Sequence, residues 1–202
     1  MSKHNEQQHK DQRVGVFVDV QNMYHSGKNL YGANVNFEKI LNAAVANRQL
    51  IRAIAYVICS NTSEEQNFFE TISKYGFELK VKDLQIFSSG MKKGDWDVGL
   101  AVDAIKLADK LDVVVLVTGD GDFIPLVQYL KENKGCRVEL LAFEKTTSSK
   151  LLKVVDDFLN LGGKTSNFLI RKRVPMTRKQ NVGWKRNQKN NKNNKNNKIN
   201  KS

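Results

Sequence analysis

Acidic residues stand at the ends of two strongly apolar segments of the sequence. Residues 14–19 read Val-Gly-Val-Phe-Val-Asp, and residues 113–122 read Val-Val-Val-Leu-Val-Thr-Gly-Asp-Gly-Asp. Valine-rich runs of this kind are typical of strands that are buried on both faces of a parallel sheet. Because open α/β sheets bind ligands at the carboxyl ends of their strands, we expect Asp19, Asp120 and Asp122 to share one site. Clustered carboxylates favour hard cations such as Mg²⁺ or Mn²⁺, which support phosphate chemistry.

These acids also have an alternative, structural interpretation. Asp19 ends a strand, and an aspartate in that place often forms a turn or caps a helix. A helix is expected directly after Asp120, but one helix needs one N-cap, and Asp-Gly-Asp supplies two acids. Close carboxylates repel each other unless a cation or a proton lies between them, which favours a metal site. Thr118 can donate its hydroxyl to a carboxylate or to a substrate phosphate, or it can be an ordinary strand residue.

Two further acids lie at the start of a helix expected over 95–110. Asp95 and Asp97 fall in its first turn, where acidic residues are favoured in any case. Asp103 follows Asp97 by six residues, which is about 120° further round a helix, so the two cannot both point into one site. We therefore expect Asp97 to face the metal and Asp103 to face a basic partner.

Three residues near these acids are candidates for contacts with substrate. Asn22 follows Asp19 by three residues and can orient substrate or water, or it can bind backbone in a turn. Lys92 and Lys93 belong to a flexible loop expected over 88–94. They are candidate phosphate contacts, with a solvated loop as the alternative.

The net charge of +12 is carried by the end of the chain. Residues 164–202 hold 13 lysines and arginines and no acid, whereas residues 1–163 hold 20 basic and 21 acidic residues. A basic segment rich in asparagine cannot bury a core, so we expect it to be disordered. Two roles remain open for it: an arm that binds RNA phosphates without reading sequence, or a solubilising tail of low complexity.

Composition bounds the other classes of function. No apolar run approaches the roughly 20 residues of a membrane span, and the polar N-terminus lacks the features of a signal peptide. Cys59 and Cys136 have no metal-binding spacing and are expected to be reduced thiols in a cytoplasmic protein. Neither a dinucleotide fingerprint nor a Walker loop is present. The oligomeric state stays open, with a homodimer as one option.

The alternation of strand and helix patterns predicts a single α/β domain with a mainly parallel sheet. We expect a disordered N-terminus over 1–12, the domain over 13–163 and the basic tail over 164–202. Residues 22–31 are expected to form a loop or an irregular helix, because they contain Gly27 and lead to Gly32. Further strands are expected over 51–59, 77–84 and 137–143, and helices over 37–47, 60–75 and 122–133, with short helices over 147–161.

Three motifs follow one another along the chain. They read Asp19-Val-Gln-Asn-Met-Tyr, Lys93-Gly-Asp-Trp-Asp-Val-Gly-Leu-Ala-Val-Asp103 and Thr118-Gly-Asp-Gly-Asp-Phe-Ile-Pro125. Over about residues 13–161 the chain resembles the NYN domain family, in particular its LabA-like branch. The resemblance implies a PIN-like, Rossmann-like three-layer α/β sandwich. Its mainly parallel sheet would have five to six strands in the order 3-2-1-4-5, with the first and fourth strands side by side.

The resemblance also implies a site and an activity. The acidic site of the family corresponds to Asp19, Asp97, Asp120 and Asp122, and Asn22 is its recurring asparagine. Thr118 stands where many relatives have serine. The implied function is that of a ribonuclease dependent on Mg²⁺ or Mn²⁺, with RNA as its partner. The alternative is a non-catalytic regulatory module that binds RNA or protein, whereas a small-molecule phosphatase would need no basic tail.

Overall fold

The computed structural model describes most of the chain. The chain divides into two units, Met1–Lys172 and Arg173–Ser202, and every described residue belongs to the first. The structure describes residues 10–59, 63–86, 92–162 and 167–170. Most of the segments expected to be disordered, 1–12 and 164–202, therefore lie outside the described residues.

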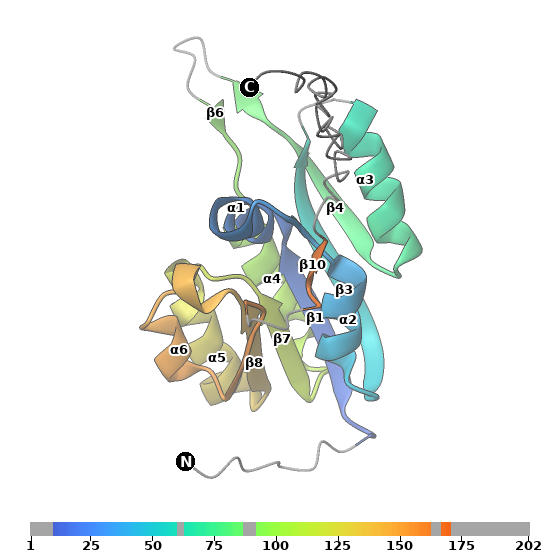
Figure 1. Ribbon diagram of the computed structural model, residues 1–202. Helices are drawn as coiled ribbons and strands as arrows, with labels where there is room; N and C mark the ends of the chain where they lie inside the picture. Colours follow the sequence, from blue (N-terminus) through green and yellow to red (C-terminus); the bar gives the residue numbers. More distant parts are fainter. Residues whose placement is uncertain (1–9, 60–62, 87–91, 163–166, 171–202) are drawn as a thin grey trace, which may run out of the picture. The chain divides into compact units, whose positions relative to one another are not determined.

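Six strands form the main sheet, and every neighbouring pair is parallel. They are β1 (Arg13–Asp19), β3 (Gln49–Cys59), β4 (Glu78–Asp83), β7 (Val113–Val117), β8 (Arg137–Ala142) and β9 (Asp157–Asn160). Their order across the sheet is β4-β3-β1-β7-β8-β9 (Figure 1). Numbered along the chain, this is the expected order 3-2-1-4-5 with a sixth strand at the edge. The switch in direction lies between β1 and β7, where such sheets bind ligands.

Helices cover both faces of this sheet. The helices α1 (Val20–Tyr31), α2 (Phe37–Val45) and α3 (Ser63–Lys74) lie on one face, and α4 (Asp97–Ala108) and α5 (Ile124–Lys134) lie on the other (Figure 1). A short helix, α6 (Leu151–Val154), packs against α5. The chain therefore has the three-layer α/β fold expected from the sequence. No helix among the described residues is long and apolar enough to cross a lipid bilayer.

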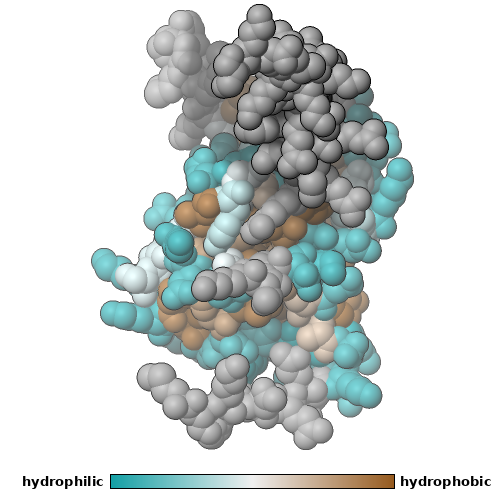
Figure 2. Space-filling model, in the orientation of Figure 1, coloured by the Kyte–Doolittle hydropathy of each residue, from teal (hydrophilic) through white to brown (hydrophobic). Residues whose placement is uncertain are grey.

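The two valine-rich strands are buried on both faces, as the sequence predicts. All five residues of β7 and the apolar side chains of β1 from Val14 to Val18 are 0% exposed. Continuous apolar strands of this kind need helices on both sides of the sheet, and they have them. Figure 2 shows hydrophilic residues over much of the described surface on one face, with apolar atoms visible between them.

The segment after β1 is a regular helix and not the loop or irregular helix that we expected. Asp19 caps its start by accepting the backbone N–H of Asn22. Gly32 ends it with a φ of 59°, the left-handed conformation in which glycine is favoured. Gly27 lies inside the helix, where an added Cβ would come within 2.8 Å of Val35 Cγ2. This glycine allows close packing and does not break the helix.

The last part of the fold contains a strand where only short helices were expected over 147–161. After α6, β9 pairs with β8 in parallel. The carboxylate of Asp156 fixes the start of this strand, because it accepts the backbone N–H of Val138 over 2.8 Å and binds Lys131 over 2.8 Å. Contacts between segments far apart in the sequence therefore select the strand.

Helix starts near the expected site also differ from the prediction. The helix expected from Asp95 begins at Asp97, so Asp95 precedes it. The helix expected from Asp122 opens with a 3-10 turn, η1 (Gly121–Phe123), before α5 begins.

Two short antiparallel pairs complete the described fold. β5 (Gln85–Ile86) pairs with β6 (Lys92–Lys93), so these two lysines lie in a strand and not in the expected loop, whose residues 88–91 lie outside the described part. β2 (Asn34–Val35) pairs with β10 (Leu169–Ile170), and the backbone N–H of Asn36 donates to the carbonyl of Phe168 over 2.8 Å. The domain end expected at 163 therefore leaves out a strand that pairs with the fold.

Candidate metal centre

Asp19 and Thr118 lie side by side where β1 and β7 end. Because Val18 pairs with Val117, the next residue of each strand emerges at the same level of the sheet. The buried hydroxyl of Thr118 donates to Asp19 Oδ2 over 3.3 Å and accepts the backbone N–H of Asp120 over 3.3 Å. The threonine thus links the two strand ends through hydrogen bonds.

Two of the four acids also cap helices. Asp19 Oδ1 accepts the backbone N–H of Asn22 over 3.0 Å at the start of α1. Asp120 Oδ1 accepts the backbone N–H of Asp122 over 3.0 Å at the start of η1. The capping role considered for Asp19 and Asp120 is therefore real. Asp122 does not serve as the cap of this turn, and one of its carboxylate oxygens lies near those of Asp97 and Asp120.

Three acids from two segments converge at this edge. Asp97, Asp120 and Asp122 each offer one carboxylate oxygen, and these oxygens lie within 4.8 Å of one another. Two oxygens that share a divalent cation at bonds of about 2.0–2.6 Å lie at most about 5 Å apart, so the spacing fits such an ion. Asp19 is not one of these three, but it lines the same pocket with Asp97 and Asp120. An all-oxygen set of this kind suits Mg²⁺ or Mn²⁺.

The carboxyl group of Asp19 ionises at a higher pH than an ordinary aspartate. Burial raises its pKa to about 6, and the negative charges of Asp97 and Asp120 act in the same direction. The hydrogen bonds from the Asn22 N–H and the Thr118 hydroxyl oppose this rise without cancelling it. Negative charge at the end of β1 is therefore costly until a cation balances it.

The pKa of Asp97 is also raised, for similar reasons. Burial raises its pKa, and the charges of Asp120, Asp95 and Asp122 raise it further. The pKa values of Asp19 and Asp97 are thus shifted in the direction that a divalent cation would reverse. Perturbed carboxyl groups in a shared pocket are typical of functional sites.

Two glycines let the turn after β7 approach a neighbouring loop. An added Cβ on Gly119 would lie 2.8 Å from the carbonyl oxygen of Thr146, and one on Gly121 would lie 2.8 Å from Ser148 Oγ. The backbone N–H of Ser148 donates to the carbonyl of Gly119 over 2.9 Å, which holds the loop against the turn. The glycines in the Thr-Gly-Asp-Gly-Asp motif therefore provide space as well as a sharp turn.

The start of α4 is anchored to the sheet by Trp96. Its indole Nε1 donates to the carbonyl of Val57 on β3 over 2.9 Å. Its ring lies over the first turn of α4, where an added Cβ on Gly99 would come within 2.5 Å of Cε3. The ammonium group of Lys82 lies 5.6 Å from the centre of the ring. These contacts set the position from which Asp97 reaches the centre.

Asp103 belongs to a separate cluster. Its Oδ2 accepts the hydroxyl of Tyr56 over 2.8 Å and lies 2.6 Å from Lys80 Nζ. Burial alone would raise its pKa, but the hydrogen bonds from Lys80 and Tyr56 outweigh it and lower the pKa. Asp103 thus faces a basic partner, as its position on the helix relative to Asp97 predicts.

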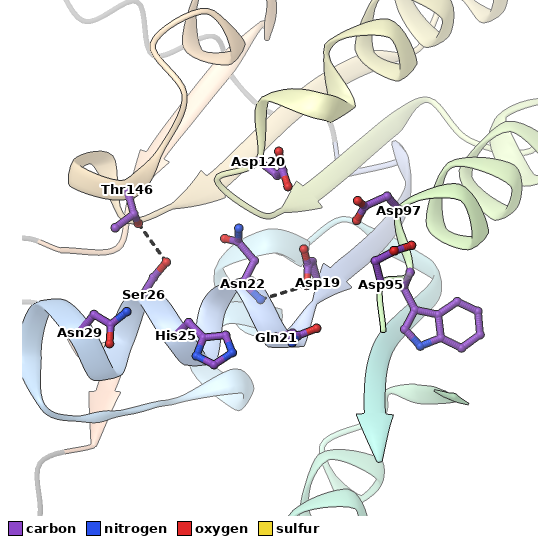
Figure 3. Close-up of a pocket in the computed structure, with 11 residues that line it drawn as sticks. Asp19, Gln21, Asn22, His25, Ser26, Asn29, Asp95, Asp97, Asp120 and Thr146 are labelled. Carbon is purple, nitrogen blue, oxygen red and sulfur yellow. Dashed lines mark hydrogen bonds between the residues drawn. The ribbon is translucent and has the colours of Figure 1, made fainter. Parts of the chain in front are cut away.

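A pocket of about 330 Å³ contains this acidic edge and continues along α1. Asp95, which is exposed, also lines it. Figure 3 shows Asp19, Asp95 and Asp97 toward one end, Asn29, Ser26 and Thr146 toward the other, and Asn22 between them. The complete lining is Asp19, Gln21, Asn22, His25, Ser26, Asn29, Asp95, Trp96, Asp97, Asp120 and Thr146.

Known proteins resemble this chain over most of its described part. The sequence model of the NYN domain matches residues 13–162. The chain belongs to the NYN domain family. This confirms the resemblance drawn from the three motifs, and it places the chain in a PIN-like family of the nuclease type.

Individual relatives of this NYN domain are distant in sequence. The low amplitude and bright protein LabA of Synechococcus elongatus is 23% identical over 158 residues, which cover 74% of this chain and 83% of LabA. An uncharacterized protein of Methanocaldococcus jannaschii is 25% identical over 154 residues, which cover 75% of this chain and 56% of that protein. The crystal structure of a protein of unknown function from Vibrio parahaemolyticus superposes with a TM-score of 0.74. That protein is 32% identical, and the match covers 81% of this chain and 99% of that one.

The candidates for substrate contacts are placed differently in this NYN domain. Asn22 lines the pocket, and its side-chain oxygen accepts the backbone N–H of Gly119 over 2.9 Å. The backbone of Lys92 and Lys93 lies in β6, but their side chains lie outside the described part. Their role as phosphate contacts stays a prediction.

Sequence reasoning missed a group of pocket residues on α1. Gln21, His25, Ser26 and Asn29 line the pocket together with Thr146. The spacing of Asn22, His25 or Ser26, and Asn29 by three or four residues is the signal that could have found them. It was not used, because a regular helix was not expected there.

Proposed function

We propose that this NYN domain is a metal-dependent ribonuclease that hydrolyses phosphodiester bonds in RNA. Its cofactor would be Mg²⁺ or Mn²⁺. The observation that carries the proposal is the convergence of three carboxylate oxygens from Asp97, Asp120 and Asp122 within 4.8 Å, at the edge of the sheet where ligands bind. The membership of the chain in a PIN-like family of the nuclease type supports the same conclusion.

The four acids would have graded roles at the centre. Asp97, Asp120 and Asp122 supply the closest set of ligands. Asp19 already accepts two hydrogen bonds, but a carboxylate has about four acceptor positions and can bind a cation in addition. When bound, the cation supplies charge stabilisation at the phosphate and lowers the pKa of water.

The protein around the acids would orient them and the substrate. Thr118 holds Asp19 to the end of β7, and the indole of Trp96 holds the start of α4. The hydrogen bond from Gly119 uses the side-chain oxygen of Asn22, which leaves its NH₂ group available in the pocket. That group is a donor suited to a phosphate or ribose oxygen.

The basic end of the chain supports RNA as the partner. Residues 164–202 carry 13 positive charges and no acid, next to 163 residues with slightly more acids than bases. Contacts of such a segment with phosphates would raise affinity for RNA of any sequence and would weaken as salt is added.

Cleavage of labelled single-stranded RNA in Mn²⁺ tests the proposal. Wild type is expected to cleave in Mn²⁺ and not in EDTA, whereas Asp120→Asn and Asp97→Asn are expected to be inactive although folded. Asp11→Asn is the matched control, because Asp11 is an exposed acid just before β1, at the opposite end of that strand. Equal cleavage by wild type and Asp120→Asn would overturn the proposal and point to a contaminating nuclease.

A second candidate is a non-catalytic NYN-fold module that binds RNA or another protein. The observation that favours it is that Asp19 and Asp120 cap helices. This gives the two carboxylates a structural role that needs no catalysis. A fold alone does not establish an activity. Wild type that binds RNA in Mn²⁺ without cleaving it would decide for this candidate.

A further inference from the structure

The pocket at the metal centre extends beyond the acids along one face of α1. Asn22, Ser26 and Asn29 follow one another at spacings of four and three residues, so they lie on the same side of the helix. Gln21 and His25, four residues apart, form a second row beside them. Asn29 follows Asn22 by seven residues, which is about 10 Å along the helix axis.

The two ends of this pocket differ in chemistry. Four carboxylates, those of Asp19, Asp95, Asp97 and Asp120, lie toward one end. The α1 end is lined by amide, imidazole and hydroxyl groups and by no acid. No lysine or arginine lines the pocket among the residues that the structure describes. An anionic group therefore has a place only at the acidic end, where a cation can balance it.

The groups at the α1 end match a nucleoside. The amides of Gln21 and Asn29 each offer donors and an acceptor, the pattern that pairs with base edges and with ribose hydroxyls. His25 adds an exposed aromatic ring, and such rings stack on bases. Its orientation is supported by an edge contact with Tyr24, whose ring centre lies 5.6 Å away.

The wall behind these groups is held in place. Thr146 Oγ1 donates to Ser26 Oγ over 2.9 Å, which joins α1 to the loop that follows β8. At the end of the helix the Tyr31 hydroxyl donates to the carbonyl of Gly162 over 3.2 Å. A pocket that is formed before binding loses less entropy when a ligand enters.

The size of the pocket limits its ligand. A volume of about 330 Å³ is near the lower limit for small-molecule sites, which begin at about 300 Å³. A pocket of this size suits a ligand as small as one nucleotide. The amides of Gln21 and Asn29 can bind the pairing edge of a base only when that base is unpaired.

We propose that Gln21, His25 and Asn29 form a nucleoside subsite that holds one unpaired nucleotide next to the phosphate bound at the acidic end. The proposal rests on the proposed function, because the metal centre supplies the site for the phosphate. It assigns to α1 the choice of single-stranded over double-stranded RNA.

Binding of single nucleotides tests this subsite without any need for cleavage. The probes are adenosine and cytidine monophosphate, titrated in Mn²⁺, with inorganic phosphate as the reference probe. We expect His25→Ala and Asn29→Ala to weaken nucleotide binding at least tenfold and to leave phosphate binding and Mn²⁺ affinity unchanged. All three side chains of the subsite are exposed, so their removal leaves the core intact. Gln21→Ala is the further variant if one of these fails to fold.

The matched control is Asn42→Ala, which removes an exposed asparagine from α2. It is expected to bind nucleotides as wild type does. Nucleotide affinities of His25→Ala, Asn29→Ala and Gln21→Ala equal to that of the control would overturn the subsite.

RNA kinetics separate a failure of the subsite from a failure of the proposed function. If wild type cleaves RNA, the subsite predicts that His25→Ala and Asn29→Ala raise KM for single-stranded RNA, and an unchanged KM would reject it. If wild type does not cleave but the variants lose nucleotide binding, the ribonuclease proposal fails and the subsite stands.

Discussion

The side-chain oxygen of Asn22 accepts a hydrogen bond from the backbone N–H of Gly119 over 2.9 Å. The bond joins the first turn of α1 to the turn that carries Asp120, two segments 97 residues apart in the sequence. Since Gly119 is buried, its N–H depends on this partner. Asn22 therefore helps to fix the distance between the two strand ends that carry Asp19 and Asp120.

Asn22→Ala is expected to destabilise the protein, because it leaves the buried N–H of Gly119 unpaired. The free energy of unfolding should fall by about 1–3 kcal/mol. Asn22→Asp keeps an acceptor for the Gly119 N–H but adds a negative charge beside the other acids. Its free energy of unfolding should therefore fall more in EDTA than in Mn²⁺. Urea unfolding in both conditions measures these effects. A loss for Asn22→Ala below a few tenths of a kcal/mol would show that the bond has no structural weight.

Asp19 should make the stability of the metal-free protein depend on pH. Its pKa is about 6 in the folded state against 3.8 as the ordinary value, so the folded state binds more protons between these two values. The free energy of unfolding in EDTA should therefore fall as the pH rises, by about 2 kcal/mol between pH 4 and pH 6 and by about 3 kcal/mol over the whole titration.

Asp19→Asn should remove this dependence and keep the cap, because asparagine is also a good N-cap. In EDTA above pH 6 the variant should be at least as stable as wild type, and its stability should change less between pH 4 and pH 6. Asp19→Ala, which also loses the cap, separates the two roles. If Asp19→Asn melts well below wild type in EDTA at neutral pH, the Asp19 carboxylate stabilises the fold. Its repulsion by the neighbouring acids would then not limit the stability of the metal-free protein.

Much of the fold follows from local patterns in the sequence. The valine runs that end in Asp19 and before Thr118 predict buried parallel strands, and the structure confirms them as neighbours. These patterns suffice because a strand covered on both faces must be apolar throughout. The same reasoning predicts that acids at the two ends meet at one edge.

Other features depend on contacts that single segments do not reveal. Gly27 suggests a broken helix, but it is needed because Val35 packs against that point of α1. β10 has no signal of its own, since two residues form a strand only where β2 offers a partner. The polar residues of α1 that line the pocket were also not predicted. Their spacing of three and four residues places them on one face only if the segment is a regular helix.

Gly99→Ala should weaken metal binding although Gly99 is not itself a proposed metal ligand. The new Cβ would come within 2.5 Å of the Trp96 ring, which must move and take the start of α4 and Asp97 with it. Changes in groups that orient metal ligands typically cost about 10–100-fold in affinity. We expect a fall of about tenfold in Mn²⁺ affinity, measured by calorimetric titration.

Val98→Ala is the control in the same turn, because the side chain of Val98 is 74% exposed. Trp96→Phe removes the hydrogen bond to Val57 together with the part of the indole that lies over Gly99, so it should also lower the Mn²⁺ affinity. Wild-type Mn²⁺ affinity in Gly99→Ala would show that the indole does not position Asp97.

Truncation after Gly163 should lower stability, although it leaves every strand of the main sheet. It removes β10, the carbonyl of Phe168 that accepts the Asn36 N–H, and the side chain of Leu169 that packs on the core. Urea unfolding should show a lower midpoint than for a chain that ends at Lys172. Equal midpoints for the two truncations would mean that β10 adds nothing to the fold.

Truncation after Lys172 should instead separate RNA affinity from folding and turnover. It removes 10 positive charges and no acid, which leaves 23 basic and 21 acidic residues. If the basic segment binds phosphates, the shortened chain should lose most of its affinity for single-stranded RNA and most of the salt dependence of binding, because fewer counterions are released. Turnover at saturating RNA should persist, since every proposed metal ligand precedes Phe123 in the chain. Binding titrations of both chains at about 50 and about 200 mM salt measure the effect. Equal affinities and equal salt slopes would leave the segment without a role in RNA binding.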